Sequence, residues 1–303
     1  MGMNHPGEIS RLSPIALPDI AMVINTAGVH LEGLGSVGNV AKAKAEIFDG
    51  IRKNGVAILF ADDPRRNILE KKAREKNIQT LLFFGSGNGS NIRSFKVKTL
   101  GDSTEFTIKI KNLETPFSIN SPAPFMVDNC LAAICAAGSA GICPEGIKKG
   151  IKAFTPVKGR MNIYRLSDLI HIIDDTYNAN PASVAQALNT LNIVSKDKNS
   201  IAVLGDMLEL GDESAFYHRQ IGQKVAMLRI NKLYVFGSLV KHTMEGAIEN
   251  GFSKDNIFHG TKDQIVEKLL DNAKTKTWIL VKGSRGMAME TVIQGLEKLI
   301  MVA

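Results

Sequence analysis

The chain has 303 residues, of which 44% are hydrophobic and 22% are charged. At about 100–200 residues per domain this length predicts two domains, and the composition is typical of a globular protein and excludes a disordered one. The cysteines are odd in number and have no spacing that fits a disulfide framework or a zinc site: Cys130, Cys135 and Cys143. We therefore expect the three cysteines to be reduced and buried, in a cytoplasmic protein.

Lysine and arginine number 37 against 30 acidic residues, which gives a net charge of +7. The positive residues form no dense block, so the sequence does not favour a nucleic-acid partner, and an anionic small substrate explains the excess. The longest apolar run, residues 131–143, is too short to span a bilayer, and the N-terminus has no signal-peptide pattern. We expect no membrane insertion and a monomer.

The chain opens on GMNHPGEI, a turn that leads into a helix with no strand before it. This start indicates either a frayed terminus or a chain without its natural beginning. A short strand over 19–26 and a Gly-rich loop then lead into a helix over 37–51. Apolar residues recur along one face of that helix: Val37, Val40, Ile47 and Ile51. Lys44 lies on this inward face and Lys42 on the outward one, and spacing alone favours a snorkelling Lys44 over one that is used chemically.

Strands are predicted over 56–60 and 80–84, with an exposed helix between them. The following GSGNGSN is interpreted as a plain loop, because Ser90 stands where a dinucleotide fingerprint has its third glycine and no helix follows. The patterns over 94–100 and 104–110 predict antiparallel strands that cover an α/β core. Asp128 is expected to cap an Ala-rich helix, and a second helix follows over 144–154.

We place a domain boundary after residue 156, which gives domains 1–156 and 157–303. Beyond it, four apolar strands each lead into a helix: 169–175, 200–206, 232–238 and 277–284. Repeated strand–helix units predict a parallel, doubly wound sheet, so the fold class is α/β with a Rossmann-like second domain.

Ligands bind outside the carboxyl ends of the strands in such sheets, so the loops there form the candidate site. Asp174 and Asp175 are adjacent carboxylates at the end of an apolar strand, where charge is costly unless it is paired or used. The loop 205–211 adds further acids. Residues 282–286 precede a helix, where lysine, arginine and backbone amides make a plausible anion site. Each loop alone is a solvated turn about as often as it is a site.

Six segments in order resemble one family: GMNHPGEI, GVHLEGLGSVGNVAKAKAEIF, KGR, DDTYNANPASVAQAL, VLGDMLELG with a later His218, and VKGSRGMAME. The chain resembles, over its whole length, the D-alanyl-D-alanine-adding ligases of the Mur ligase superfamily. The DD-x-YNANP, GDM-x-ELG and KGSR motifs are specific for these members. The resemblance implies a central ATPase domain followed by a C-terminal Rossmann-like domain.

The resemblance also implies a reaction in peptidoglycan precursor synthesis. ATP phosphorylates the carboxylate of UDP-N-acetylmuramoyl-tripeptide, and the amine of D-Ala-D-Ala then attacks the acyl phosphate. ATP and Mg²⁺ are the implied cofactors. Another amide ligase of the superfamily, such as a folylpolyglutamate synthase, is disfavoured by YNANP and KGSR.

Residue roles follow from the same resemblance. His30 corresponds to a magnesium-binding histidine, and Lys44 to a lysine that is carbamylated and helps to bind a second magnesium; both are therefore expected to be catalytic. Four residues correspond to nucleotide-binding positions: Asn129, Arg160, Asp175 and Tyr177. Five correspond to positions near the reacting groups and the peptide substrate: Asn178, Asn180, Lys282, Ser284 and Arg285.

Two departures from the family pattern carry expectations of their own. The adenine-site pattern H-N-x-x-N reads FMVDN over 125–129, so only its second asparagine is present. The family's UDP-sugar domain and Gly-rich phosphate loop are not found, and no G-x-x-x-x-G-K-[ST] occurs. We therefore expect an N-terminally shortened ligase that is inactive alone. The alternative is an inactive remnant, or a half-enzyme that needs a separately encoded partner.

Overall fold

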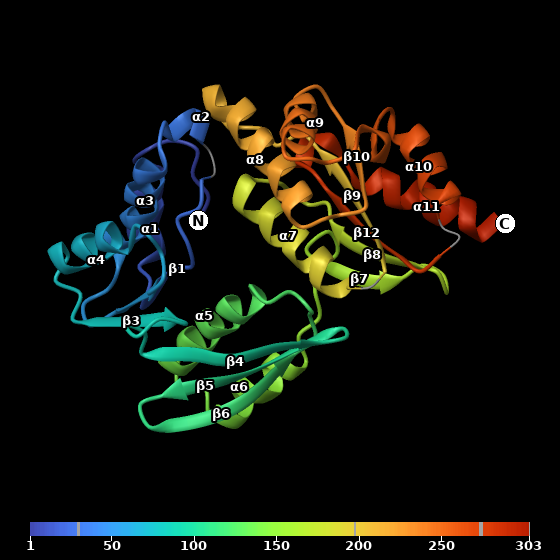
Figure 1. Ribbon diagram of the computed structural model, residues 1–303. Helices are drawn as coiled ribbons and strands as arrows, with labels where there is room; N and C mark the ends of the chain where they lie inside the picture. The colour runs from blue at the N-terminus through green and yellow to red at the C-terminus, as the bar shows by residue number, and fades with distance from the viewer. Residues whose placement is uncertain (29–30, 197, 273–274, 303) are drawn as a thin grey trace. The chain divides into compact units, whose positions relative to one another are not determined.

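The computed structural model describes residues 1–28, 31–196, 198–272 and 275–302. Contacts divide the chain into unit 1, residues 1–120 and 124–154, and unit 2, residues 121–123 and 155–303. Each unit contains one six-stranded sheet. The prediction of an α/β fold is confirmed (Figure 1).

Unit 1 consists, in chain order, of α1 (Glu8–Ala16), β1 (Ile20–Val23), α2 (Leu31–Leu34), α3 (Val37–Ala45), η1 (Glu46–Gly50), β2 (Val56–Phe60), α4 (Arg66–Glu75), β3 (Thr80–Gly85), β4 (Ile92–Leu100), β5 (Ser103–Ile110), β6 (Leu113–Ile119), α5 (Met126–Ser139) and α6 (Pro144–Lys152). Its sheet has the order β1-β2-β3-β4-β5-β6, parallel from β1 to β4 and antiparallel from β4 to β6.

The antiparallel strands of unit 1 differ from expectation in two ways. They do not cover the α/β core but extend its sheet, because β4 pairs in parallel with β3 through Phe84 and Ile92. In addition, β6 is not predicted from the sequence, because Pro116 interrupts its pattern. Since β6 is an edge strand, it tolerates a residue that cannot donate to the ladder.

Two helix boundaries also differ. The helix expected over 37–51 ends at Ala45 and continues as the 3-10 turn η1, so Phe48 is buried and Ile47 is only half-buried. Lys42 is exposed and Lys44 half-buried, as the helical spacing predicts. Asp128 is not the cap of α5: backbone hydrogen bonds from Val127 N–H to the Pro124 carbonyl and from Asp128 N–H to the Phe125 carbonyl start the helix earlier and place Asp128 in the first turn.

The cysteines differ from expectation at one position. Cys130 and Cys135 are buried in α5, as expected, but Cys143 is exposed, because it lies in the turn just before α6.

Unit 2 consists of β7 (Asn162–Arg165), β8 (Ile170–Asp175), α7 (Pro181–Val194), β9 (Asn199–Gly205), η2 (Gly211–Glu213), α8 (Ser214–Met227), β10 (Lys232–Phe236), α9 (Val240–Glu249), η3 (Lys254–Asn256), β11 (Ile257–His259), α10 (Lys262–Asp271), β12 (Thr277–Lys282), η4 (Arg285–Met287) and α11 (Glu290–Val302). The sheet order is β11-β10-β9-β12-β8-β7, and only β7 is antiparallel to its neighbour.

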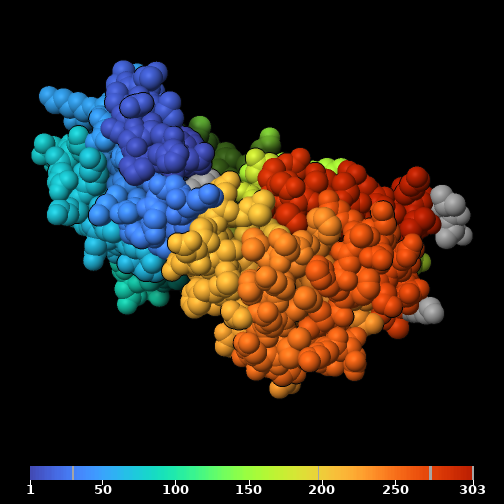
Figure 2. Space-filling view, turned by 90° about the horizontal axis from the view of Figure 1, so that it is seen from above, coloured from blue at the N-terminus to red at the C-terminus, as the bar shows by residue number. Residues whose placement is uncertain are grey.

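The four predicted parallel strands of unit 2 are confirmed as β8, β9, β10 and β12. Every residue of β12 is buried, as a central strand covered on both faces requires. Figure 2 shows the surface of this unit, coloured from yellow to red. Because β8, β9 and β12 are parallel, the loops that follow them lie at one edge of the sheet.

We predict that residues 155–303 fold without unit 1, because they contain a complete sheet and its covering helices. The chain's single tryptophan, Trp278, is 4% exposed in β12 and therefore reports on this unit. Urea unfolding of the fragment, followed by Trp278 fluorescence, should be cooperative. A gradual transition without a native baseline would contradict this boundary.

Candidate functional site

The carboxyl end of β8 is tied to the segment that precedes β7. Asp174 is 1% exposed, and its carboxylate accepts hydrogen bonds from Gly159 N–H at 3.0 Å and from the Thr176 hydroxyl at 2.7 Å. Gly159 has φ +77° and its carbonyl accepts the Tyr177 N–H at 2.9 Å. Asp174 therefore fixes the two segments that carry Arg160 and Tyr177.

Asp175 and Lys282 form an ion pair across neighbouring strands. They are register partners in β8 and β12, and Lys282 Nζ lies 2.5 Å from Asp175 Oδ2. The Lys282 side chain is 2% exposed and also donates to the Asn178 carbonyl at 2.9 Å, while Asp175 Oδ1 accepts Met161 N–H at 3.1 Å. Burial lowers the pKa of Lys282, and the Asp175 carboxylate opposes that shift. The pair is a structural link between the strands.

Ser284 joins the loops after β8 and β9. Its hydroxyl accepts Leu208 N–H at 2.8 Å and donates to the Ala179 carbonyl at 3.4 Å. The neighbouring Gly283 has no room for a side chain, because a Cβ there would lie 2.6 Å from Met289 Cγ. Close packing of this kind holds the loop 282–286 in one position.

Two further buried groups at this edge have positioning roles that the spacing did not predict. Asp206 accepts the N–H groups of Leu239 and Val240 at the start of α9, at 3.0 and 2.9 Å. His218 Nε2 accepts Met207 N–H at 3.1 Å, and the opposite ring nitrogen contacts the Ser214 carbonyl at 2.8 Å. These contacts fit the neutral ring protonated at Nδ1, and burial lowers the pKa of His218 accordingly.

Three side chains at this edge face solvent. The Arg160 guanidinium lies 4.0 Å from the centre of the Tyr177 ring, and Tyr177 is 47% exposed. Arg285 is 63% exposed and pairs with Glu290 at 2.8 Å. Cations and an aromatic face held in this way can contact an anionic ligand with a flat base.

The two asparagines expected to contact substrate make local contacts. Asn178 Oδ1 accepts the N–H groups of Ala179 at 2.8 Å and of Arg285 at 3.4 Å. Asn180 caps α7 in a capping box with Ser183. The structure thus brings Asp175, Asn178 and Lys282 into direct contact and uses Asn180 as a cap.

In unit 1, Lys44 lies next to the loop that follows β1. Its amine donates to the Asn25 carbonyl at 2.8 Å, while the Asp63 carboxylate holds Thr26 through its N–H at 2.7 Å and its hydroxyl at 2.6 Å. Burial lowers the pKa of Lys44, and the charge of Asp63 opposes this. His30 lies outside the described residues.

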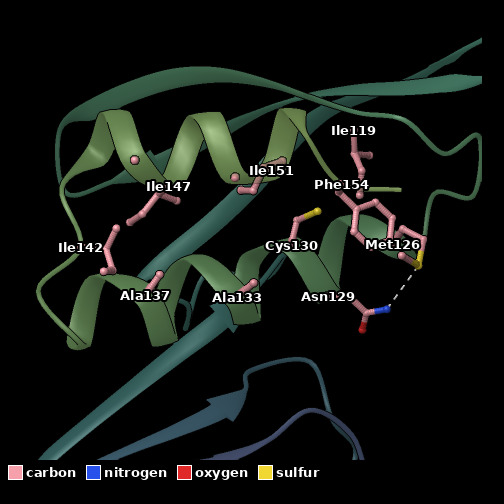
Figure 3. A pocket seen from close by; sticks show the side chains of 12 residues that line it. Ile119, Met126, Asn129, Cys130, Ala133, Ala137, Ile142, Ile147, Ile151 and Phe154 are labelled. Carbon is pink, nitrogen blue, oxygen red and sulfur yellow. Dashed lines mark hydrogen bonds between the residues drawn. The ribbon is translucent and has the colours of Figure 1, made fainter. Parts of the chain in front are cut away.

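Asn129 is exposed on α5, at one end of an apolar pocket of about 330 Å³ between α5 and α6. Figure 3 shows Ala133 and Ile147 among the side chains that line it, and the Asn129 amide donating to Met126 Sδ at 3.4 Å. Burial and the nearby Asp62 carboxylate raise the pKa of Asp128 to about 6. Asp128, whose carboxyl group has this raised pKa, directly precedes Asn129, the one asparagine of the expected adenine pattern that is present.

No group of three or more His, Cys, Asp or Glu side chains that could hold a metal ion occurs in the described parts of the chain. The atoms around Lys44 are hard oxygen donors, from Asn25, Thr26 and Asp63, which is the donor type that Mg²⁺ prefers.

Among the residues that the structure describes, no helix is long and apolar enough to cross a membrane.

Comparisons with known proteins agree on one family. A family model of the Mur ligase middle domain matches residues 1–137, and a model of the Mur ligase glutamate ligase domain matches residues 159–285. UDP-N-acetylmuramoyl-tripeptide–D-alanyl-D-alanine ligases of Bacillus subtilis and Escherichia coli are 33% and 32% identical over 98% of this chain. The chain spans 63% and 64% of the length of these relatives.

Solved structures are similar in the same way. MurF from Acinetobacter baumannii has a TM-score of 0.87 at 27% identity and is covered over 64% of its length by 98% of this chain. MurF of Thermotoga maritima in complex with ADP has a TM-score of 0.84 at 25% identity, with 99% of this chain and 66% of that chain covered. A folylpolyglutamate synthase of Thermotoga maritima, 14% identical with a TM-score of 0.63, shares the fold alone.

Asp175→Asn should destabilise unit 2, because it leaves the buried Lys282 ammonium without its charge partner. We expect the free energy of unfolding to fall by about 3 kcal/mol in urea titrations followed by Trp278 fluorescence. The control is Asp168→Asn, which alters an exposed pair with Arg165 and should cost less than about 1 kcal/mol. Equal effects of the two substitutions would contradict the structural role of the pair.

The stability of unit 2 should depend on pH through His218. Because burial lowers its pKa in the folded state, the unfolded state binds more protons below about pH 6.5, so stability should fall as the pH drops through that range. His218→Gln should remove this component of the pH dependence, measured from urea midpoints between pH 5 and 7. His259→Gln, which changes an exposed histidine of the same unit, should retain it. An unchanged pH profile in His218→Gln would assign the dependence elsewhere.

Proposed function

Because the chain belongs to the Mur ligase superfamily, we propose that it carries the ATP-binding and amide-forming parts of a ligase that joins D-Ala-D-Ala to UDP-N-acetylmuramoyl-tripeptide. The relatives named for this reaction support the proposal, as do the DD-x-YNANP and KGSR loops that meet at the edge of the unit 2 sheet. The protein would act in the cytoplasm, as a monomer, in peptidoglycan precursor synthesis.

The observation that carries the proposal is that the loop 282–286 contains one buried and one exposed cation, Lys282 and Arg285. Lys282 forms an ion pair with Asp175 and so holds the strand ends together. Arg285, in the same loop, is exposed to solvent, where its guanidinium pairs with Glu290. Arg285 would bind a carboxylate of the incoming dipeptide, since guanidinium and carboxylate groups match in geometry. Asn178 would orient that loop through the Arg285 N–H.

Arg160 and Tyr177 would bind the nucleotide. The guanidinium stacked on the ring at 4.0 Å supplies positive charge for phosphate groups, and the exposed ring offers a flat apolar face. In unit 1, Asn129 is the residue that corresponds to a base-contacting asparagine of the family, and its amide is exposed on α5. Phosphoryl transfer needs mainly positioning and charge stabilisation, which is what these groups supply.

Lys44 would act as a carbamate. Burial favours its neutral amine, which is the form that takes up carbon dioxide, and the carbamate oxygens would join those of Thr26 as ligands. Together with His30, Lys44 would hold Mg²⁺, whose charge offsets that of the phosphate groups. Thr26 is held in place for this by Asp63.

The proposal is tested by joining the chain to the part of the Bacillus subtilis relative that lies outside the match, since the match covers 63% of that relative. This fusion, given ATP, Mg²⁺ and both substrates, should release phosphate and form the pentapeptide product only when D-Ala-D-Ala is present. Turnover that is independent of D-Ala-D-Ala, or that prefers glutamate as the amine, would contradict the proposed substrate. The same assay of the chain alone should show no measurable phosphate release or pentapeptide formation.

In the fusion, Lys44→Ala should lower ligation by about 100-fold or more, because a group that stabilises transition-state charge is lost. Lys42→Ala removes the same charge from the exposed face of α3 and should change the rate by less than about twofold. Bicarbonate should stimulate the parent but not Lys44→Ala. Similar rates for the two variants would rule out a special role for Lys44.

A further inference from the structure

Unit 1 has a second concave surface, which no residue of the candidate site lines. This hollow of about 580 Å³ is lined by residues of β4, β5, β6 and α6. Its lining includes Lys96, Lys98, Lys148 and Lys152. The only acidic residue in the lining is Glu105, the cross-strand partner of Lys98. The hollow therefore concentrates positive charge.

These four ammonium groups form no ion pair with any residue that the structure describes, in contrast to Lys72 and Lys76 of the same unit, which share the Asp49 carboxylate. Like charges in one hollow repel each other and favour a bound anion. The arrangement leaves the charge available to a ligand.

The backbone also places one of these lysines in a conformation that needs a reason. A register irregularity between Phe95 and Lys98 puts two residues of β4 opposite one of β5, and Lys96 within it has φ +54°. Lysine adopts a left-handed conformation only at an energetic cost, and bulges commonly redirect a side chain toward a site. Here Lys96 lines the hollow, and its ammonium lies 5.4 Å from the centre of the Phe95 ring.

The other wall is anchored to the sheet. The Asn120 amide donates to the carbonyl of Lys152 at 3.2 Å, which ties the end of α6 to the end of β6. Lys148 and Lys152 are four residues apart on α6, so their Cβ atoms lie about 6 Å from each other on one face. Two pairs of cations on two separate elements suit a ligand with several linked anionic groups better than a single ion.

We propose that this hollow binds a small molecule with linked phosphate groups, at a site separate from the nucleotide-binding residues. Lysine binds phosphate as a point charge, and the Thr107 and Ser118 hydroxyls in the lining add neutral donors. Occupation of this site is independent of the ligase activity proposed above.

Calorimetric titration of the full chain with inorganic tripolyphosphate, in about 0.15 M salt, tests the proposal. We expect one saturable site in this hollow. The double variants Lys96→Gln/Lys98→Gln and Lys148→Gln/Lys152→Gln should each weaken binding about tenfold. Arg160→Gln should leave it unchanged, which separates this site from the nucleotide-binding edge of unit 2.

The matched control is Lys109→Gln/Lys111→Gln, which removes the same charge from β5 and the turn that follows it, outside the hollow. This variant should bind as the parent does, and circular dichroism should show all variants folded. If the control variant bound tripolyphosphate as weakly as the two hollow variants, the loss of binding would come from the lower net charge alone, and the proposal would be overturned. Citrate binding as tightly as tripolyphosphate would overturn the preference for phosphate.

Discussion

The ion pair between Lys282 and Asp175 is the interaction on which the edge of unit 2 depends. It joins the ends of two adjacent parallel strands, and each partner holds a further segment: Lys282 holds the Asn178 carbonyl, and Asp175 holds the Met161 N–H. A pair buried to this extent repays its desolvation only when its geometry is good and its other hydrogen bonds are made. Both conditions are met here, so the strand ends and their loops have one arrangement.

Groups that hold the site and groups that would meet a ligand are distinct at this edge. Asp174, Asp206 and His218 are buried, and each accepts a hydrogen bond from a backbone N–H of a neighbouring segment. Arg160 and Arg285 are exposed. Unit 1 repeats the pattern on a smaller scale, because Asp63 fixes the loop that Lys44 contacts. Such division lets side chains be rigid in position while their charge faces solvent.

The sequence predicts the parallel strands well, because a fully buried strand is a short continuous apolar run, as in residues 277–282. It predicts poorly where helices end and where edge strands lie. The turn η1 buries Phe48 in place of Ile47, and Pro116 interrupts the pattern of the edge strand β6. The motifs and the family resemblance name the residue types of the candidate site, but the ion pair of Asp175 with Lys282 joins positions 107 apart. No local pattern contains that information.

A double-mutant cycle on Asp175→Asn and Lys282→Met measures the central link most directly. Urea unfolding of the parent, both single variants and the double variant, followed by Trp278 fluorescence, gives the coupling free energy between the two side chains. We predict a coupling of about 2–3 kcal/mol, because either single substitution strands the other buried group while the double one does not. Additive losses, with a coupling near zero, would contradict an edge organised by this pair.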